Sequence, residues 1–128
     1  MDEQPPGEVV GTTCPLCGGP LWRRDGGQGA NGDGVAAYEC RIGHTLTPAQ
    51  LWTDHAAMRN RAVAAAARAM AEHIDLARAL AREARAAGGD GLATRLDEEA
   101  RSEEQHLGQL LAILEGLVDD DTVDGTGS

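Results

Sequence analysis

The sequence predicts a small α+β protein, mostly helical, in which a short β-hairpin precedes a long antiparallel two-helix hairpin. Two observations predict this fold class. Cysteine and histidine form two short pairs near the start, Cys14 with Cys17 and Cys40 with His44. Residues 49–87 then contain neither Gly nor Pro and are rich in Ala, and a Gly-Gly pair separates them from a second segment with helical periodicity.

The first elements are a lead and a hairpin. We expect residues 1–11 to be a disordered lead, because they are rich in Pro, Glu and Gly. Two short strands are expected at 21–24 and 35–40, where apolar, aromatic and Arg residues lie on either side of the glycine-rich run 26–34. Pairing of these strands would bring the two Cys/His pairs together within a unit that spans residues 12–46.

Cys14, Cys17, Cys40 and His44 have the types and the spacing of ligands for a structural zinc site. Such a site takes four thiolate or imidazole ligands in a tetrahedron. A gap of two residues lets the first two sulfurs converge, and Gly43 lets the backbone bend just before His44. We therefore expect Zn²⁺ as the cofactor and a zinc-ribbon-like hairpin. The alternative, a redox dithiol of Cys14 and Cys17, leaves the second pair without a role and lacks a surrounding βαβ pattern.

The first helix begins with several concurring signals. Thr47 is a suitable N-cap, Pro48 suits the first turn, and Gln50 completes a capping box. Apolar residues with 4-3 spacing predict an inner face that extends to about Ala87, formed by Val63, Ala67, Met70, Ile74, Ala77, Ala81 and Ala84.

The second helix is expected to begin with Asp90 as its cap and to end near Val118. Its predicted inner face consists of Leu96, Ala100, Leu107, Leu111, Leu114 and Val118. Residues 47–118 thus form the antiparallel helical hairpin, and residues 119–128 an acidic disordered tail.

The charges of the two helices and the exposed apolar residues at the start of the first helix predict how the elements pack. The net charge is −10, and the first helix carries Arg78, Arg82 and Arg85 where the second carries mainly acids. Antiparallel pairing sets these charges side by side, although each exposed ion pair contributes only about 0–1 kcal/mol. We also expect the metal hairpin to dock on the root of the helices as one continuous unit, with Leu21, Trp22 and Ile42 covering Leu51, Trp52 and Met58.

The segments that carry the ligands resemble a known family. Cys14-Pro-Leu-Cys17-Gly-Gly-Pro-Leu-Trp22 and Tyr38-Glu-Cys40-Arg-Ile-Gly-His44-Thr-Leu-Thr-Pro48, with the helices that follow, are similar to the C-terminal extension found on some bacterial chemotaxis protein-glutamate methylesterases. The resemblance covers roughly residues 12–116 and implies a zinc site at the same four residues. It does not imply catalysis, since the chain has neither the esterase nucleophile turn nor a receiver domain.

The residue inventory predicts a protein that is not an enzyme. Ser102 and Ser128 are the only serines, the cysteines are committed to the metal, and four protein ligands leave zinc no open position. We therefore expect a non-enzymatic protein-interaction or adaptor module in bacterial signalling. One alternative is a ferritin-like di-iron or metal-handling protein that uses Glu103 and His106, whose spacing matches the Glu-x-x-His motif of such proteins. In the antiparallel pairing these two residues are expected near the level of Glu72 and His73.

A second alternative is a nucleic-acid-binding zinc ribbon, although only Arg23, Arg24 and Arg41 lie near the ligands. The expected partners are an unidentified protein and a second copy of the chain bound through the helices. Surplus apolar residues lie off the predicted inner faces, namely Leu76, Leu80, Leu92, Leu110, Ile113 and Leu117. We expect no membrane association and a cytoplasmic location, because the N-terminus lacks the basic start and apolar run of a signal peptide.

Overall fold

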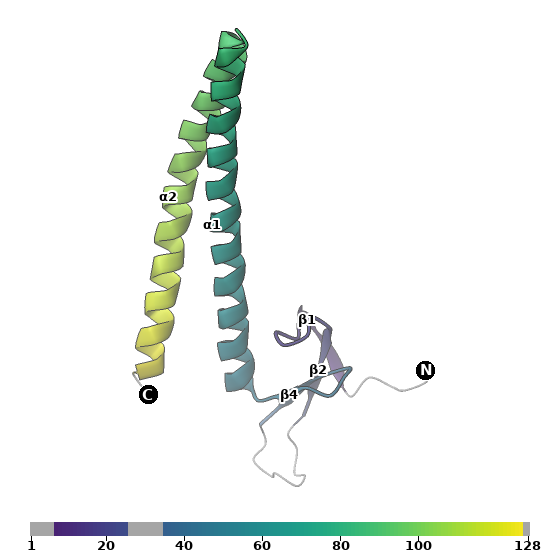
Figure 1. The fold of residues 1–128 in the computed structure, drawn as a ribbon. Helices are drawn as coiled ribbons and strands as arrows, with labels where there is room; N and C mark the ends of the chain where they lie inside the picture. The colour runs from purple at the N-terminus through teal and green to yellow at the C-terminus, as the bar shows by residue number, and fades with distance from the viewer. Residues whose placement is uncertain (1–6, 26–34, 127–128) are drawn as a thin grey trace. The chain divides into compact units, whose positions relative to one another are not determined.

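The computed structural model describes residues 7–25 and 35–126. In this part of the chain a small sheet precedes two long helices (Figure 1), which confirms the predicted α+β class with a helical hairpin. The elements are β1 (Glu8–Thr13), β2 (Pro20–Arg24), β3 (Ala37–Cys40), β4 (Thr45–Leu46), α1 (Pro48–Ala86) and α2 (Asp90–Thr126).

The sheet is antiparallel, with its strands in the order β1-β2-β3-β4. The predicted pair of strands corresponds to β2 and β3, which align Leu21 with Cys40. Two further strands were not predicted, and β1 occupies 8–11 of the expected disordered lead. The pairing of Val9 with Trp22 explains β1, because partner strands stabilise a segment whose own composition suggests no structure. Residues 1–6 of the lead and the glycine-rich run 26–34 lie outside the described residues.

Apolar residues from the sheet and from the start of α1 form the first core. Leu21 is fully buried with Cys14, Cys40 and Leu46, and Leu51 of α1 packs against this cluster. The expected roles of Trp52 and Ile42 in this cover were wrong, since each is 72% exposed. Successive helical residues point about 100° apart, so Leu51 and Trp52 cannot both face the sheet.

The ends of the helices follow the local chemistry of the sequence. The capping box is confirmed: the Gln50 backbone N–H donates to Thr47 Oγ1 at 3.1 Å, and the Thr47 N–H donates to Gln50 Oε1 at 2.9 Å. After α1, Gly88 has a φ of +85°, which permits the sharp connection to α2. Asp90 is the first residue of α2 rather than its cap, because the Gly89 carbonyl already accepts the first helical hydrogen bond, from Ala93.

The two helices pack through a seam of apolar residues spaced three and four apart. The predicted face of α1 is confirmed, with Ala67, Ile74, Ala77 and Ala81 buried and the others half-buried. In α2, Leu111 and Val118 are exposed, which contradicts the prediction. The seam of α2 instead follows strict heptad spacing through Ala93, Leu96, Ala100, Glu103, Leu107, Leu110, Leu114 and Leu117.

Two ion pairs along one side of the hairpin show the register of the helices. Arg85 binds Asp97 and Arg78 binds Glu104, each at 2.8 Å. Each residue of the second pair lies seven positions from its counterpart in the first, so the register is constant over a heptad. This arrangement confirms the predicted pairing of Arg-rich and acidic helices.

The second helix continues beyond the end that the sequence predicted. It extends to Thr126 and so includes residues 119–126, which we expected to be disordered. No Gly or Pro interrupts the chain between Leu117 and Asp124, so nothing local stops the helix near Val118. Within the described residues, neither long helix is apolar enough to cross a membrane.

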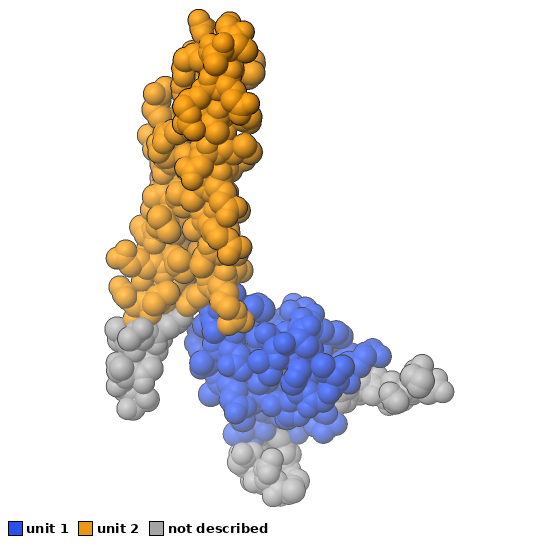
Figure 2. Space-filling model, in the orientation of Figure 1, with its two compact units in different colours: residues 1–59 blue, residues 60–128 orange. Residues whose placement is uncertain are grey.

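The chain divides into two compact units, shown in blue and orange in Figure 2. Unit 1 comprises residues 1–59 and unit 2 residues 60–128. The boundary falls inside α1, whereas the sequence analysis placed a boundary at residue 46 and expected the whole to be one continuous unit. The first three turns of α1 belong with the sheet because they supply Leu51 to its core.

Candidate metal centre

The sheet topology brings the two ligand pairs to the same edge. The first pair, Cys14 and Cys17, lies in the connection between β1 and β2, and the second pair, Cys40 and His44, spans the connection between β3 and β4. In an antiparallel sheet of consecutive strands, these two connections lie at the same end. Leu21, four residues after Cys17, is aligned with Cys40 in the sheet, so the two ligand pairs lie next to each other.

The four side chains converge on one point. Their ligand atoms all lie within 4.8 Å of one another. Cys17 Sγ is 3.7 Å from Cys40 Sγ, and His44 Nδ1 is 3.7 Å from Cys14 Sγ and 3.3 Å from Cys40 Sγ. Cys14 and Cys40 are buried, His44 is half-buried and Cys17 is exposed. The donors therefore face a shared position, with two of the four residues buried and two at least partly open to solvent.

Backbone hydrogen bonds shape both ligand pairs. The Gly18 N–H donates to the Cys14 carbonyl and the Cys14 N–H donates to the Gly19 carbonyl, each at 2.7 Å. In the second pair, the Cys40 N–H donates to the His44 carbonyl at 3.0 Å. Gly18 and Gly43 have φ values of +79° and +103°, a region that other residues rarely adopt. Gly18 thus allows the chain to turn back just after the first ligand pair, and Gly43 allows it to turn within the second.

The surroundings shift the pKa values of two thiols in opposite directions. Burial opposes ionisation of Cys40, but the backbone N–H groups of His44 and Ile42 outweigh it and lower the pKa of Cys40 to about 6. The Gly19 N–H also favours the thiolate of Cys17. Loss of hydration and the neighbouring thiols of Cys40 and Cys14 outweigh it, however, and raise the pKa of Cys17. The site thus already favours one thiolate, the form in which cysteine binds metals.

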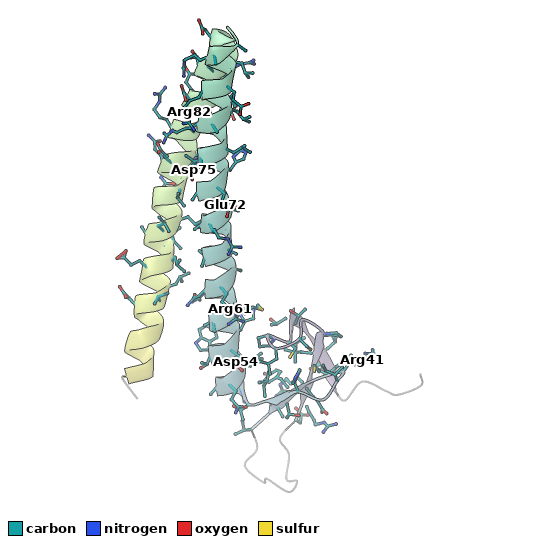
Figure 3. The ribbon with its side chains drawn as sticks, in the orientation of Figure 1. Arg41, Asp54, Arg61, Glu72, Asp75 and Arg82 are labelled. Carbon is teal, nitrogen blue, oxygen red and sulfur yellow. The ribbon has the colours of Figure 1, made fainter. Side chains whose placement is uncertain are left out.

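The residues of the alternative iron site also lie together, but they are arranged differently. Glu103 and His106 line a surface depression on the helical hairpin, with His73, Glu99 and Ser102. Within the described residues, the donor atoms of this group do not converge as those of the cysteine site do. Glu72, expected at the same level, is exposed and pairs with Arg68 of its own helix at 3.9 Å. It lies along α1 with Asp75 and Arg82 in Figure 3.

His73 was not among the residues expected to bind iron. His73 Nδ1 lies 2.7 Å from Glu103 Oε2, and this carboxylate raises the pKa of His73. The heptad spacing of α2 from Ala93 onward is the signal that could have placed Glu103 in the seam beside α1.

Comparison with known proteins found no similar protein. No protein-family model matches the chain, and searches of the curated proteins and of the solved structures find no match.

Proposed function

We propose that this chain is a non-enzymatic protein-interaction module whose small sheet is held together by one Zn²⁺ ion at Cys14, Cys17, Cys40 and His44. The spacing of the donor atoms carries this proposal. Tetrahedral zinc with Zn–S bonds of about 2.3 Å and Zn–N bonds of about 2.0–2.1 Å requires S···S distances of about 3.8 Å and S···N distances of about 3.5 Å. The S···S distance of 3.7 Å and the S···N distances of 3.3 and 3.7 Å match these requirements.

A structural role suits both the ligand set and the size of the sheet. Four protein ligands complete the tetrahedron, so no position remains for a water or substrate molecule. Leu21 is the one large apolar side chain besides the ligands that the described part of unit 1 buries completely. So small a core needs the metal, whose binding contributes on the order of 10 kcal/mol in zinc-finger peptides.

The charges around the centre favour a protein partner over a nucleic acid. Arg23 binds Asp25 at 2.6 Å, and Arg24 lies 3.2 Å from Glu39. The guanidinium of Arg41, labelled in Figure 3, lies over the Trp22 ring at 5.5 Å. A nucleic-acid site needs clustered cations directed at phosphates. Two of these three arginines are already neutralised by carboxylates.

Exposed apolar residues in unit 1 support an interaction surface. Ile42, in the second ligand pair, and Trp52, in α1, are each 72% exposed. Large exposed aromatic and aliphatic side chains are typical anchors of protein interfaces. The partner that we propose is a bacterial signalling protein, because the segments that carry the ligands resemble the methylesterase extension.

A ferritin-like di-iron function is not our proposal. Such a centre needs several carboxylates and a Glu-x-x-His motif from each of two helices. To the depression that holds Glu103 and His106, α1 contributes only His73.

The test combines metal analysis with the change Cys40→Ser. We expect one zinc per purified chain, and we expect Cys40→Ser to lose the ion and the fold of unit 1. Tryptophan fluorescence reports this unit alone, since Trp22 and Trp52 both lie in it. Circular dichroism should still show the helices of unit 2.

Leu16→Ala is the matched control, because Leu16 lies between the first two ligands but is 56% exposed. It should keep both the zinc and the fold. Purified protein without zinc, or a Cys40→Ser variant with an unchanged unit 1, would refute the structural metal. The interaction role is tested separately: a partner bound by the zinc-loaded protein should be lost in Ile42→Ser/Trp52→Ser, and binding unaffected by this double change would refute the proposed surface.

A further inference from the structure

One seam position of α2 carries a charge where its neighbours are apolar. Glu103 takes its place in the heptad series between Ala100 and Leu107, and its side chain is only 28% exposed. A half-buried carboxylate costs free energy unless a partner compensates it. Nothing in the zinc-dependent role of unit 1 explains its presence in unit 2.

A group of polar residues surrounds this carboxylate. His73 of α1 binds Glu103 across the seam at 2.7 Å. His73, Glu99, Ser102, Glu103 and His106 together line a depression of about 250 Å³. Residues 99, 103 and 106 share one face of α2, because their spacing of four and three follows the helical repeat. The depression therefore gathers two imidazoles and two carboxylates from both helices.

We propose that His73, Glu103 and His106, assisted by Glu99, bind a second divalent metal ion of the zinc class. Imidazole nitrogen and carboxylate oxygen are established ligands for Zn²⁺ and similar borderline ions. Iron chemistry with two bridged ions does not follow from this set, which offers enough donors for one ion. The site lies in unit 2 and is separate from the cysteine centre of unit 1.

Metal binding at this site requires a local rearrangement of side chains. Within the described residues, only the cysteine group has all its donor atoms within 4.8 Å, so the helical site is not preformed. His73 is 63% exposed, and His106 is also exposed, so rotation of their rings meets little steric resistance. An ion would replace the direct contact between His73 and Glu103 and link the two helices through metal bonds. Binding to the folded state alone would stabilise the helical hairpin.

The experiment is a calorimetric titration with Zn²⁺ of protein that already holds one equivalent of zinc. We expect a second equivalent to bind, more weakly than the first. His73→Gln and His106→Gln should each weaken the second event at least about tenfold, since loss even of a ligand's supporting partner costs about 10–100-fold in affinity. The same titration should raise the melting temperature of the helices in the wild-type protein.

Two control variants make the result specific. Ser102→Ala changes the wall of the same depression without removing a proposed ligand, and His55→Ala removes an imidazole from unit 1. Both should bind the second equivalent as the wild type does. The proposal is overturned if no second equivalent binds at any Zn²⁺ concentration that stays soluble, or if the double variant His73→Gln/His106→Gln, with unchanged helicity, binds it as tightly.

Discussion

A single glycine sets the backbone path that carries His44 to the metal centre. Gly43 has a φ of +103°, and its N–H donates to the Cys40 carbonyl at 3.1 Å. A side chain added there would meet no atom within 4 Å. Any cost of replacing this glycine therefore comes from the backbone conformation and not from crowding.

We expect Gly43→Ala to destabilise zinc-loaded unit 1 by about 1–3 kcal/mol, the usual cost of a non-glycine residue in a sparsely populated backbone region. Chemical denaturation followed by tryptophan fluorescence measures this loss. Gly11→Ala is the matched control, because Gly11 has no positive φ and also has free space around it. It should change stability by no more than about 0.5 kcal/mol. Equal effects of the two changes would contradict the assigned role of Gly43.

At the residue scale, the sequence predicted the four residues that converge at the candidate metal centre, because their chemistry is local. The gap within each pair and the glycine before His44 are properties of a few neighbouring residues. The contact between His73 and Glu103 joins residues thirty positions apart. It depends on the helical register, which no short motif specifies. The four residues of the candidate metal centre could thus be identified from their spacing, whereas the expected register placed His73 only near the level of Glu103 and did not identify their direct contact.

At the scale of elements, strong local signals were reliable and weak ones were not. The capping box placed the start of α1, and the Gly-Gly pair placed its end within one residue. β4 has two residues, too few for any periodic pattern, and β1 depends on its partner strand. In the last turns of α2 apolar residues occur in adjacent pairs, so Leu110 or Leu111 could have faced α1. The heptad continued from Ala93 selects Leu110.

Small residues in the seam allow the helices to approach closely near their connection. Ala93 and Ala100 of α2 are fully buried, and Ala77 and Ala81 of α1 are buried with them. Ala100 also joins Ile74 and Ala77 in the core cluster of unit 2. Such a contact has no space for a larger side chain.

We expect Ala100→Leu to destabilise the helical hairpin by about 1–3 kcal/mol, because overpacking forces side chains and backbone to shift. Thermal or urea denaturation followed by circular dichroism measures the change. Ala112→Leu adds the same atoms at an exposed position of the same helix and should be nearly neutral or slightly stabilising. A neutral Ala100→Leu would mean that the seam is looser than its burial indicates.

At the scale of the whole molecule, the helical hairpin leaves apolar surface uncovered. Two antiparallel helices bury one seam, and the described residues of unit 2 still expose Leu76, Leu80, Leu92, Leu111, Ile113 and Val118 by 41–55%. Surplus apolar residues were expected, but two of those expected, Leu110 and Leu117, belong to the seam. Helices with this much exposed apolar surface commonly associate further.

We therefore expect the chain to form a homodimer through unit 2, with the exposed leucines of α1 at the contact. Sedimentation velocity at tens of micromolar should show a dimer, and Leu76→Gln/Leu80→Gln should shift it toward monomer, because both side chains lose apolar area that association would bury. Arg82→Gln, an exposed polar change on the same helix, is the control and should leave the dimer intact. A wild-type monomer at these concentrations would contradict the prediction and leave the apolar surface for a different protein.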